Sequence, residues 1–238
     1  MITKLIKQNP LLYSLALTTK HSIWRNRTKK AFASYLSNNK TPKLQLGAGV
    51  NDLPGWFNTD YFARKTIFFL DATKKFPFGD NIFEWVFSEH HIEHVTYKQA
   101  KFMLGEIFRT MKPGGYLRID TPDLKKYVAN YMNESENAAL TKQHARDWIY
   151  AGFAYASNYI PVNDYYNTHF LNDIFLNYEH RFIYDFQALK ILLKSVGFIN
   201  VTQLDATTSL HNEFKDIASH KTAFDYQFAL YVQAQKPA

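Results

Sequence analysis

Residues 43–62, KLQLGAGVNDLPGWFNTDYF, constrain the fold of this chain more than any other segment. A short apolar run ends in Gly47 and Gly49, and a second apolar run ends at Asp60. Glycine at a strand end permits unusual backbone angles and lets a ligand approach the main chain closely. The connection between the two runs has almost no room for the helix that usually joins parallel strands. The segment therefore predicts a glycine turn within a ligand site at the carboxyl ends of strands.

The rest of the chain alternates between predicted strands and helices. Strands are expected at residues 43–49, 56–62, 66–72, 81–90, 116–124, 199–206 and 226–236. A helix is expected after the N-cap candidate Thr96, ending before a Pro-Gly-Gly stop, and another over residues 184–198, with Gly197 as its C-terminal stop. Strands that alternate with helices predict an α/β fold with a doubly wound, mostly parallel sheet of seven strands. The closeness of the last two strands predicts an antiparallel pair at one sheet edge.

Basic side chains are concentrated at the start of the chain. The first 43 residues contain no acid and nine basic residues: Lys4, Lys7, Lys20, Arg25, Arg27, Lys29, Lys30, Lys40 and Lys43. We predict a helical arm over residues 1–40, interrupted near Pro10, and a main domain over residues 41–238. Two interpretations of the arm remain open. It contacts an anionic membrane surface, nucleic acid or substrate, or it is a solvated helix that packs its apolar side on the domain.

Composition excludes several classes of protein. The chain has no cysteine, which excludes disulfides, a thiolate nucleophile and a cysteine-ligated metal. No stretch approaches the run of about 18 apolar residues that spans a membrane. The first residues lack a secretory pattern. We therefore expect a cytoplasmic location, and the inner membrane face if the arm binds anionic lipid.

The glycine turn differs from the known phosphate-binding patterns. The dinucleotide fingerprint needs a third glycine where this chain has Asp52, and its acid follows about 20 residues later. Here Asp60 follows Gly49 after eleven residues, and no phosphate-loop motif is present. Asp52 would also repel a pyrophosphate. The turn therefore indicates a ligand that contains a nucleoside without phosphates.

Five motifs in order carry a family resemblance: LQLGAG, PGWFNTD, the aspartate and PF of DATKKFPF, SEHHIEH and KPGG. The match runs over residues 43–123, and EHRFIYDFQALKILLKSVGF continues the likeness. The chain resembles class I S-adenosylmethionine-dependent methyltransferases, and more narrowly a bacterial group similar to methyltransferase type 11. The resemblance implies a Rossmann-like fold and S-adenosylmethionine as cofactor.

The resemblance also implies a set of cofactor-binding residues: Gly47, Ala48, Gly49, Asp60, Tyr61, Asp71, Ala72, Ser88 and Glu89. The glycine turn would lie against the amino-acid end of the cofactor, and Asp60 would accept hydrogen bonds from the ribose. Tyr61 would stack on adenine, and Asp71 and the Ala72 amide would bind its edge. The residues after the fourth strand, including His90, would line the methionine end. Two simpler interpretations stay open, with Asp60 a turn aspartate and Asp71 a helix or turn cap.

The cluster SEHHIEH has three competing interpretations. His90, His91 or His94 acts as a general base, because the pKa of histidine lies near neutrality. Alternatively His90, Glu93 and His94 bind a divalent metal that orients a hydroxyl acceptor, or the cluster is structural. The string H-x-x-E-H also matches an inverted zinc-protease pattern, which needs a long helix around it.

Residues 123–184 predict an insertion on the acceptor side. Its tyrosines are Tyr127, Tyr131, Tyr150, Tyr155, Tyr159, Tyr165, Tyr166, Tyr178 and Tyr184, and it also holds Trp148, His144, His169, His180 and Arg181. Tyrosine offers an apolar face and a hydroxyl, which suits sugar rings. Arg181 could meet an anionic group of the substrate.

We expect O-methylation of a sugar, glycan or other small-molecule acceptor, as in polysaccharide biosynthesis. The missing [DN]-P-P-[YF] motif and the absence of cysteine argue against a nucleic-acid base as acceptor. Two alternatives stay open: an RNA 2′-O-methyltransferase, and a non-catalytic S-adenosylmethionine-binding sensor or scaffold.

Overall fold

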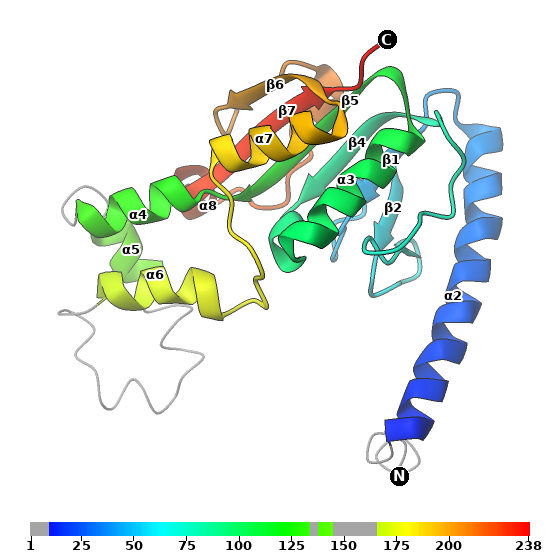
Figure 1. The fold of residues 1–238 in the computed structure, drawn as a ribbon, viewed down its shortest axis with the longest axis horizontal. Coiled ribbons are helices and arrows are strands. Elements are labelled where there is room, and N and C mark those ends of the chain that lie inside the picture. Colours follow the sequence, from blue (N-terminus) through cyan, green and yellow to red (C-terminus); the bar gives the residue numbers. More distant parts are fainter. Residues whose placement is uncertain (1–9, 134–137, 145–165) are drawn as a thin grey trace.

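A seven-stranded sheet forms the centre of the protein (Figure 1). The computed structural model describes residues 10–133, 138–144 and 166–238. The strand order is β3-β2-β1-β4-β5-β7-β6. The strands are β1 (Lys43–Leu46), β2 (Phe57–Asp60), β3 (Phe68–Phe69), β4 (Phe83–Glu89), β5 (Met111–Pro122), β6 (Ile199–Leu204) and β7 (Ala229–Gln235). Only β7 runs against its neighbours β5 and β6, so the predicted fold class and the antiparallel pair at one edge are confirmed.

The last strand begins later than expected. Residues 226–228 were predicted to start it, but they belong to the short helix α8 (Ala223–Phe228). Thr222 and Asp225 form a capping box, in which each side chain accepts a hydrogen bond from the other residue's backbone N–H. This local signal starts a helical turn before the chain enters β7 at Ala229.

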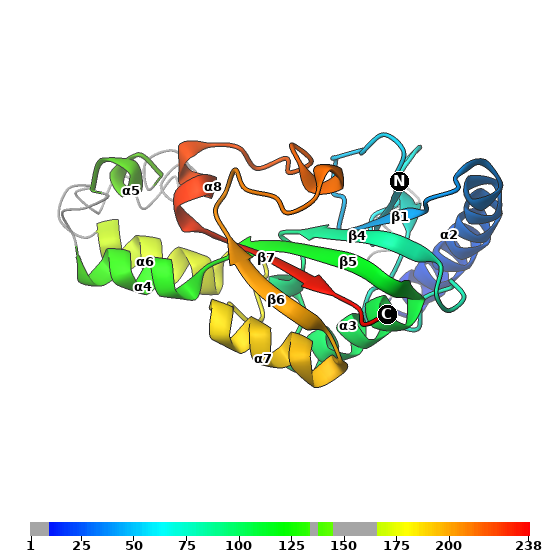
Figure 2. The ribbon, with the colours of Figure 1, turned by 90° about the horizontal axis from the view of Figure 1, so that it is seen from above.

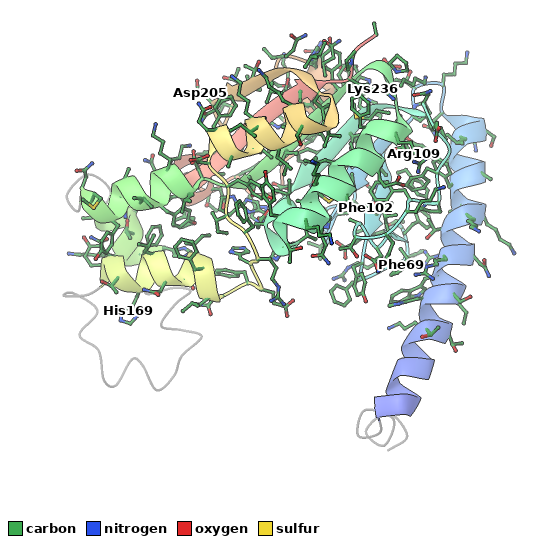
Figure 3. The ribbon with its side chains drawn as sticks, viewed as in Figure 1. Phe69, Phe102, Arg109, His169, Asp205 and Lys236 are labelled. Atoms are coloured by element: carbon green, nitrogen blue, oxygen red, sulfur yellow. The ribbon has the colours of Figure 1, made fainter. Side chains whose placement is uncertain are left out.

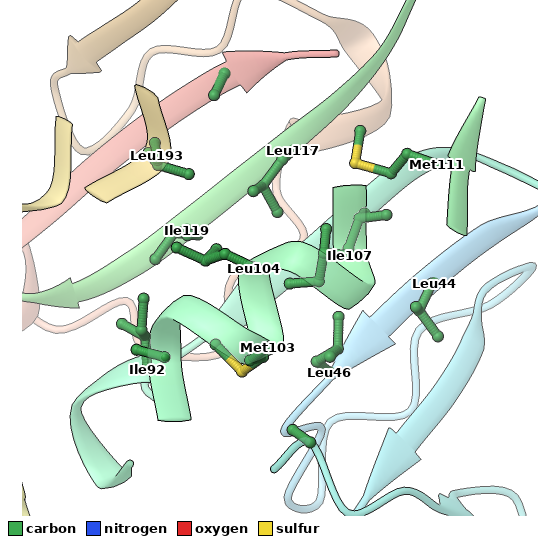
Figure 4. Packing of buried hydrophobic residues seen from close by; sticks show 14 of the residues in the cluster. Leu44, Leu46, Ile92, Met103, Leu104, Ile107, Met111, Leu117, Ile119 and Leu193 are labelled. Atoms are coloured by element: carbon green, nitrogen blue, oxygen red, sulfur yellow. The ribbon is translucent and has the colours of Figure 1, made fainter. Parts of the chain in front are cut away.

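Helices α3 (Tyr97–Thr110) and α7 (Phe186–Val196) cover one face of the sheet (Figures 1 and 2). Thr96 forms a capping box with Gln99 at the start of α3, as the sequence predicted for this N-cap. Asp185 caps α7, and Gly197 ends it with a φ of 115°. Figure 4 shows apolar side chains of both helices beside those of β1 and β5.

The opposite face is covered by the segment between β6 and β7 (Figure 2). It contains the 3-10 helix η4 (Asn212–Phe214), whose Phe214 packs in a cluster with Trp56, Trp85 and Phe87. Leu53 and Trp56 belong to the short β1–β2 connection. A distant segment therefore supplies apolar cover where that connection is too short for a helix.

Helix α2 (Pro10–Asn38) docks on the edge of the sheet near β3. Phe32 enters the core, and the Thr28 hydroxyl donates to the Phe69 carbonyl at 3.0 Å. Phe69, labelled in Figure 3, faces this helix. The basic residues Arg25 and Lys29 remain exposed, and their contact with an anionic membrane stays a prediction. Among the described helices, none is long and apolar enough to cross a membrane.

The predicted insertion forms three described helices at the other end of the sheet (Figure 1): α4 (Leu124–Met132), α5 (Ala138–His144) and α6 (Tyr166–Leu176). Tyr127, Phe170 and Ile174 form their core, with Phe228 of α8. The predicted acceptor-side residues Trp148, Tyr150, Tyr155, Tyr159 and Tyr165 lie outside the described residues.

Candidate functional site

A cavity of about 660 Å³ opens at the carboxyl ends of β1 and β4. The strand order reverses between these two strands, which is where open α/β sheets bind ligands. Most of the lining comes from three parts of the chain: the glycine turn with the end of β4, helices α4 to α6 with the loop that follows, and residues 219–225. Arg64 and Pro122 complete it. Its volume lies within the range of small-molecule sites.

Gly47 and Gly49 shape the first wall. Their φ values are +67° and +56°, a region that glycine enters without steric cost. A Cβ on Gly47 would lie 2.6 Å from the His91 ring, whereas a Cβ on Gly49 would meet nothing within 4 Å. The Gly49 amide donates to Asp60 Oδ2 at 2.9 Å, and the Phe62 amide donates to Asp60 Oδ1 at 2.7 Å. Asp60 thus fixes the turn that borders the open space.

His90 and Glu93 form the centre of the second wall. His90 has a φ of +43°, and its amide donates to the Asp120 carbonyl at 2.8 Å. His90 Nδ1 lies 3.2 Å from Glu93 Oε1, and Thr121 Oγ1 donates to Glu93 Oε2 at 2.9 Å. Burial alone would lower the pKa of His90, but the contact with Glu93 and the nearby carboxylates raise it.

His94 and His180 lie beside this pair. Their ring centroids are 5.0 Å apart, and both residues line the cavity. The Arg181 amide donates to the Glu93 carbonyl at 2.7 Å, which joins the loop after α6 to the end of β4. The Arg181 side chain is exposed and does not line the cavity, so its contact with an anionic substrate stays a prediction.

The string H-x-x-E-H does not lie in a long helix. Ile92–His94 form the three-residue 3-10 helix η1, directly after β4. The inverted zinc-protease pattern requires its ligands on one long helix. The structure therefore lacks the context of that protease.

Glu89 holds residues 219 and 220 against the end of β4. Its carboxylate accepts hydrogen bonds from the Ser219 amide at 2.8 Å, the Ser219 hydroxyl at 2.7 Å and the His220 amide at 3.0 Å. Burial alone would raise the pKa of Glu89, but these bonds and His220 lower it to about 2. Burial raises the pKa of the neighbouring Asp120 to about 6, and the Glu89 charge adds to this shift.

The comparisons with known proteins agree with this architecture. A family model for a methyltransferase domain matches residues 57–119. The match covers less than half of the chain, and it agrees with the resemblance to class I S-adenosylmethionine-dependent methyltransferases. A methyltransferase domain of this kind implies S-adenosylmethionine as the cofactor. No curated protein matches the chain by sequence.

Solved structures are similar to this chain at low sequence identity. A possible exported protein from Bordetella parapertussis is 14% identical, has a TM-score of 0.50, and is matched over 96% of this chain and 70% of that one. A possible histamine N-methyltransferase from Thermotoga maritima is 15% identical, with a TM-score of 0.46 over 93% of this chain and 97% of that one. A SAM-dependent methyltransferase from Archaeoglobus fulgidus is 13% identical, with a TM-score of 0.49 over 87% of this chain and 90% of that one. At 14% identity, the similarity to the Bordetella parapertussis protein shows the fold alone.

The geometry of the Gly47–Gly49 turn fits S-adenosylmethionine, the cofactor that the match implies. The space in front of Gly49 is open, so a ligand could approach the main chain there. Each Asp60 oxygen accepts one backbone hydrogen bond and keeps capacity for another, as two ribose hydroxyls require. The Gly47–Gly49 backbone, which lines the cavity, and Asp60, which fixes that turn without lining the cavity, are the residues expected to hold the cofactor.

The structure divides the predicted site residues into two sets. The cavity is lined by Gly47, Ala48, Gly49, Glu89, His90, Glu93 and His94. It is not lined by Asp60, Tyr61, Asp71, Ala72, Ser88 or His91. The roles assigned to both sets stay predictions.

Each member of the second set has a local environment of its own. Tyr61 is 44% exposed, and its ring lies edge-on to His21 of α2 at 5.3 Å. Asp71 Oδ1 accepts from the amide and hydroxyl of Thr73, which is a turn cap. Ala72 and Ser88 are buried. His91 packs its ring on Gly47, and burial lowers its pKa.

Some lining residues gave no signal in the sequence. Ser219, His220 and Lys221 come from the segment between β6 and β7, and Asp173 comes from α6. No motif surrounds them, and each is more than 80 positions from the end of β4. Only the packing of those segments reveals them.

Glu89 should make stability depend on pH in the acid range. Its folded pKa of about 2 lies below the unfolded value, so its contribution is full above about pH 4.5 and is lost as pH falls toward about 2. We expect Glu89→Gln to cost about 2 kcal/mol of unfolding free energy at neutral pH and much less at about pH 3. Urea denaturation of both proteins at the two pH values measures this difference. A cost that stays constant with pH would contradict the assignment.

Proposed function

We propose that the protein transfers a methyl group from S-adenosylmethionine to a hydroxyl oxygen of a small polar acceptor of the sugar or glycan class. One observation carries the proposal. The same cavity is bordered by the glycine turn and by a wall of histidines, carboxylates and tyrosines from the insertion. A donor on one side and a polar acceptor on the other would therefore share one space.

The insertion wall supports a polyhydroxylated acceptor. Tyr127, Tyr178 and Asp173 line it, and His144 Nε2 lies 3.5 Å from Asp173 Oδ2. Burial and the nearby Asp173 raise the pKa of Tyr178 to about 12, so its hydroxyl stays a hydrogen-bond donor. Aromatic faces combined with carboxylate and hydroxyl groups suit the apolar faces and hydroxyls of a sugar ring.

The protein's main task in this reaction is orientation. Bound S-adenosylmethionine supplies a sulfonium methyl group that is already activated. Holding two reactants in line can supply about 7–11 kcal/mol of the barrier. We assign to His90 the role of accepting the hydroxyl proton, because it lines the cavity and Glu93 fixes its ring.

Binding and turnover must be measured separately to test this function. Calorimetry with S-adenosylhomocysteine measures the cofactor site, and turnover is then measured with pools of sugar nucleotides and glycans. Methyl transfer to a sugar hydroxyl is expected. Cofactor binding without turnover would favour the non-catalytic sensor, and transfer to RNA alone would favour the 2′-O-methyltransferase.

His90→Asn should separate catalysis from binding. Asparagine tolerates the left-handed backbone of this position better than most residues, so the fold should persist. We expect turnover to fall by about 100-fold or more, the usual contribution of a general base. Affinity for S-adenosylhomocysteine should change little, and His211→Ala, remote from the cavity lining, is the matched control. Unchanged turnover in His90→Asn would remove this role.

A further inference from the structure

We propose that Glu93, His94 and His180 form a binding site for a divalent first-row transition-metal ion of the Zn²⁺ type. The site opens into the acceptor part of the cavity, which all three residues line. Its use in turnover rests on the proposed function, whereas binding of the ion does not. The sequence alone suggested His90, Glu93 and His94 as metal ligands. In the proposed site His180, which lies 86 positions beyond His94, takes the place of His90.

The three side chains already converge. Each offers one ligand atom, and these atoms all lie within 4.8 Å of one another. Ligands at about 2.1 Å from one ion lie roughly 3–4 Å apart. Small side-chain rotations would therefore bring the three atoms onto a single ion.

Glu93 is buried, and its Oε1 has only the His90 ring as a partner among the described residues. Its side chain is 0% exposed, and Thr121 occupies Oε2. Among the described residues, Oε1 has no hydrogen bond of good geometry and only a 3.2 Å contact with His90 Nδ1. A buried carboxylate oxygen without a full set of partners is costly, and a cation would satisfy it.

His180 is oriented as a ligand should be. Its Nδ1 lies 2.6 Å from the Ile174 carbonyl, which accepts the proton of that nitrogen and leaves Nε2 free to bind an ion. Histidine ligands of metals usually have their second nitrogen fixed by a hydrogen bond in this way. Thr121 likewise donates a hydrogen bond to Glu93 Oε2 and orients that carboxylate. The hydrogen bond to the Ile174 carbonyl therefore selects the His180 tautomer in which Nε2 carries no proton and can bind a metal ion.

The backbone before His180 is strained. Tyr178 and Glu179 have φ values of +59° and +60°, a region that few non-glycine residues adopt. Such strain persists only where the surrounding structure compensates for it, and it is concentrated at functional sites. Here the Arg181 amide, bound to the Glu93 carbonyl, holds the strained loop where His180 meets His94.

The donor set indicates the kind of ion. Two imidazoles and one carboxylate suit Zn²⁺ and its first-row neighbours, whereas Mg²⁺ and Ca²⁺ prefer oxygen ligands alone. Three protein ligands leave a coordination position open, as in catalytic zinc sites. That position would face the acceptor, so the ion would bind and polarise an acceptor hydroxyl.

Zn²⁺ binding to the full-length, tag-free protein tests the proposal. Equilibrium dialysis should give one bound Zn²⁺ per chain, with Mg²⁺ unable to compete. Co²⁺ should give visible absorption bands in the wild-type protein. His94→Ala and His180→Ala should each weaken Zn²⁺ binding by more than about 10-fold and remove the Co²⁺ bands. His211→Ala should bind as the wild type does.

Thermal unfolding without metal shows whether each variant is folded. If His180→Ala does not fold, His94→Ala and the Zn²⁺-induced rise in the Tm of the wild type decide the question. Substoichiometric binding to the wild type, or binding retained in both folded variants, would overturn the proposal. Stoichiometric binding with no methyl transfer would instead reject the proposed function and leave the metal site standing.

Discussion

Replacing Gly47 with alanine is expected to destabilise the protein by about 3 kcal/mol, whereas replacing Gly49 should cost only about 1 kcal/mol. Both residues have left-handed φ values, so both substitutions carry backbone strain. Only the Gly47 Cβ would collide with another group, the His91 ring at 2.6 Å. Moving that ring would disturb the buried segment between β4 and α3. Urea denaturation of both variants at neutral pH measures the difference.

The two glycine variants should also differ in cofactor binding. The Gly49 Cβ would enter open space beside the cavity, where we expect the cofactor. Gly49→Ala should therefore stay folded and bind S-adenosylhomocysteine more weakly in calorimetry. Equal destabilisation by both substitutions would contradict the steric argument, and full affinity in Gly49→Ala would place the cofactor elsewhere.

Asp60→Ala should weaken binding of S-adenosylhomocysteine by about 100-fold. The loss combines two effects. Hydrogen bonds to a charged acceptor are each worth about 1.5–3 kcal/mol, and the ribose would lose them. The Gly49 amide would also lose the partner that fixes the turn. Calorimetry gives the change in affinity, and denaturation of the free variant gives the cost to the fold.

Two further variants separate these effects. Asp60→Asn keeps one acceptor oxygen for the turn and should lose roughly 10-fold in affinity. Glu84→Gln changes a partly exposed carboxylate of β4 that does not line the cavity, and serves as a control for charge. If Asp60→Ala binds as tightly as Glu84→Gln does, Asp60 has no part in holding the cofactor.

Local patterns were enough to predict the sheet and the glycine wall. The Thr96 cap and the Gly197 stop depend on residues a few positions apart, so the sequence displays them directly. The start of β5 was predicted at residue 116 but lies at Met111. Gly47 and Gly49 were predicted to line a ligand site, and both do line the cavity. The predicted start of β7 was three residues too early, because the Thr222–Asp225 capping box favours a helical turn before Ala229.

The remaining parts of the site depend on contacts between distant segments. Glu89 was predicted to line the cofactor, and it does line the cavity, but its carboxylate also holds Ser219 and His220. His90 and Glu93, two members of the predicted cluster, do meet, because the left-handed backbone at His90 precedes the 3-10 helix η1 that carries Glu93.

The sequence by itself therefore determined the parallel sheet, the glycine turn and the chemical types of the residues at the end of β4. Only the tertiary structure decided which of these residues face the cavity and that His180 joins Glu93 and His94 there. The physical reason is that turns and caps depend on neighbouring residues, whereas His180 reaches the site through a strained loop and a backbone hydrogen bond to Glu93. Such contacts leave no periodic pattern in the chain.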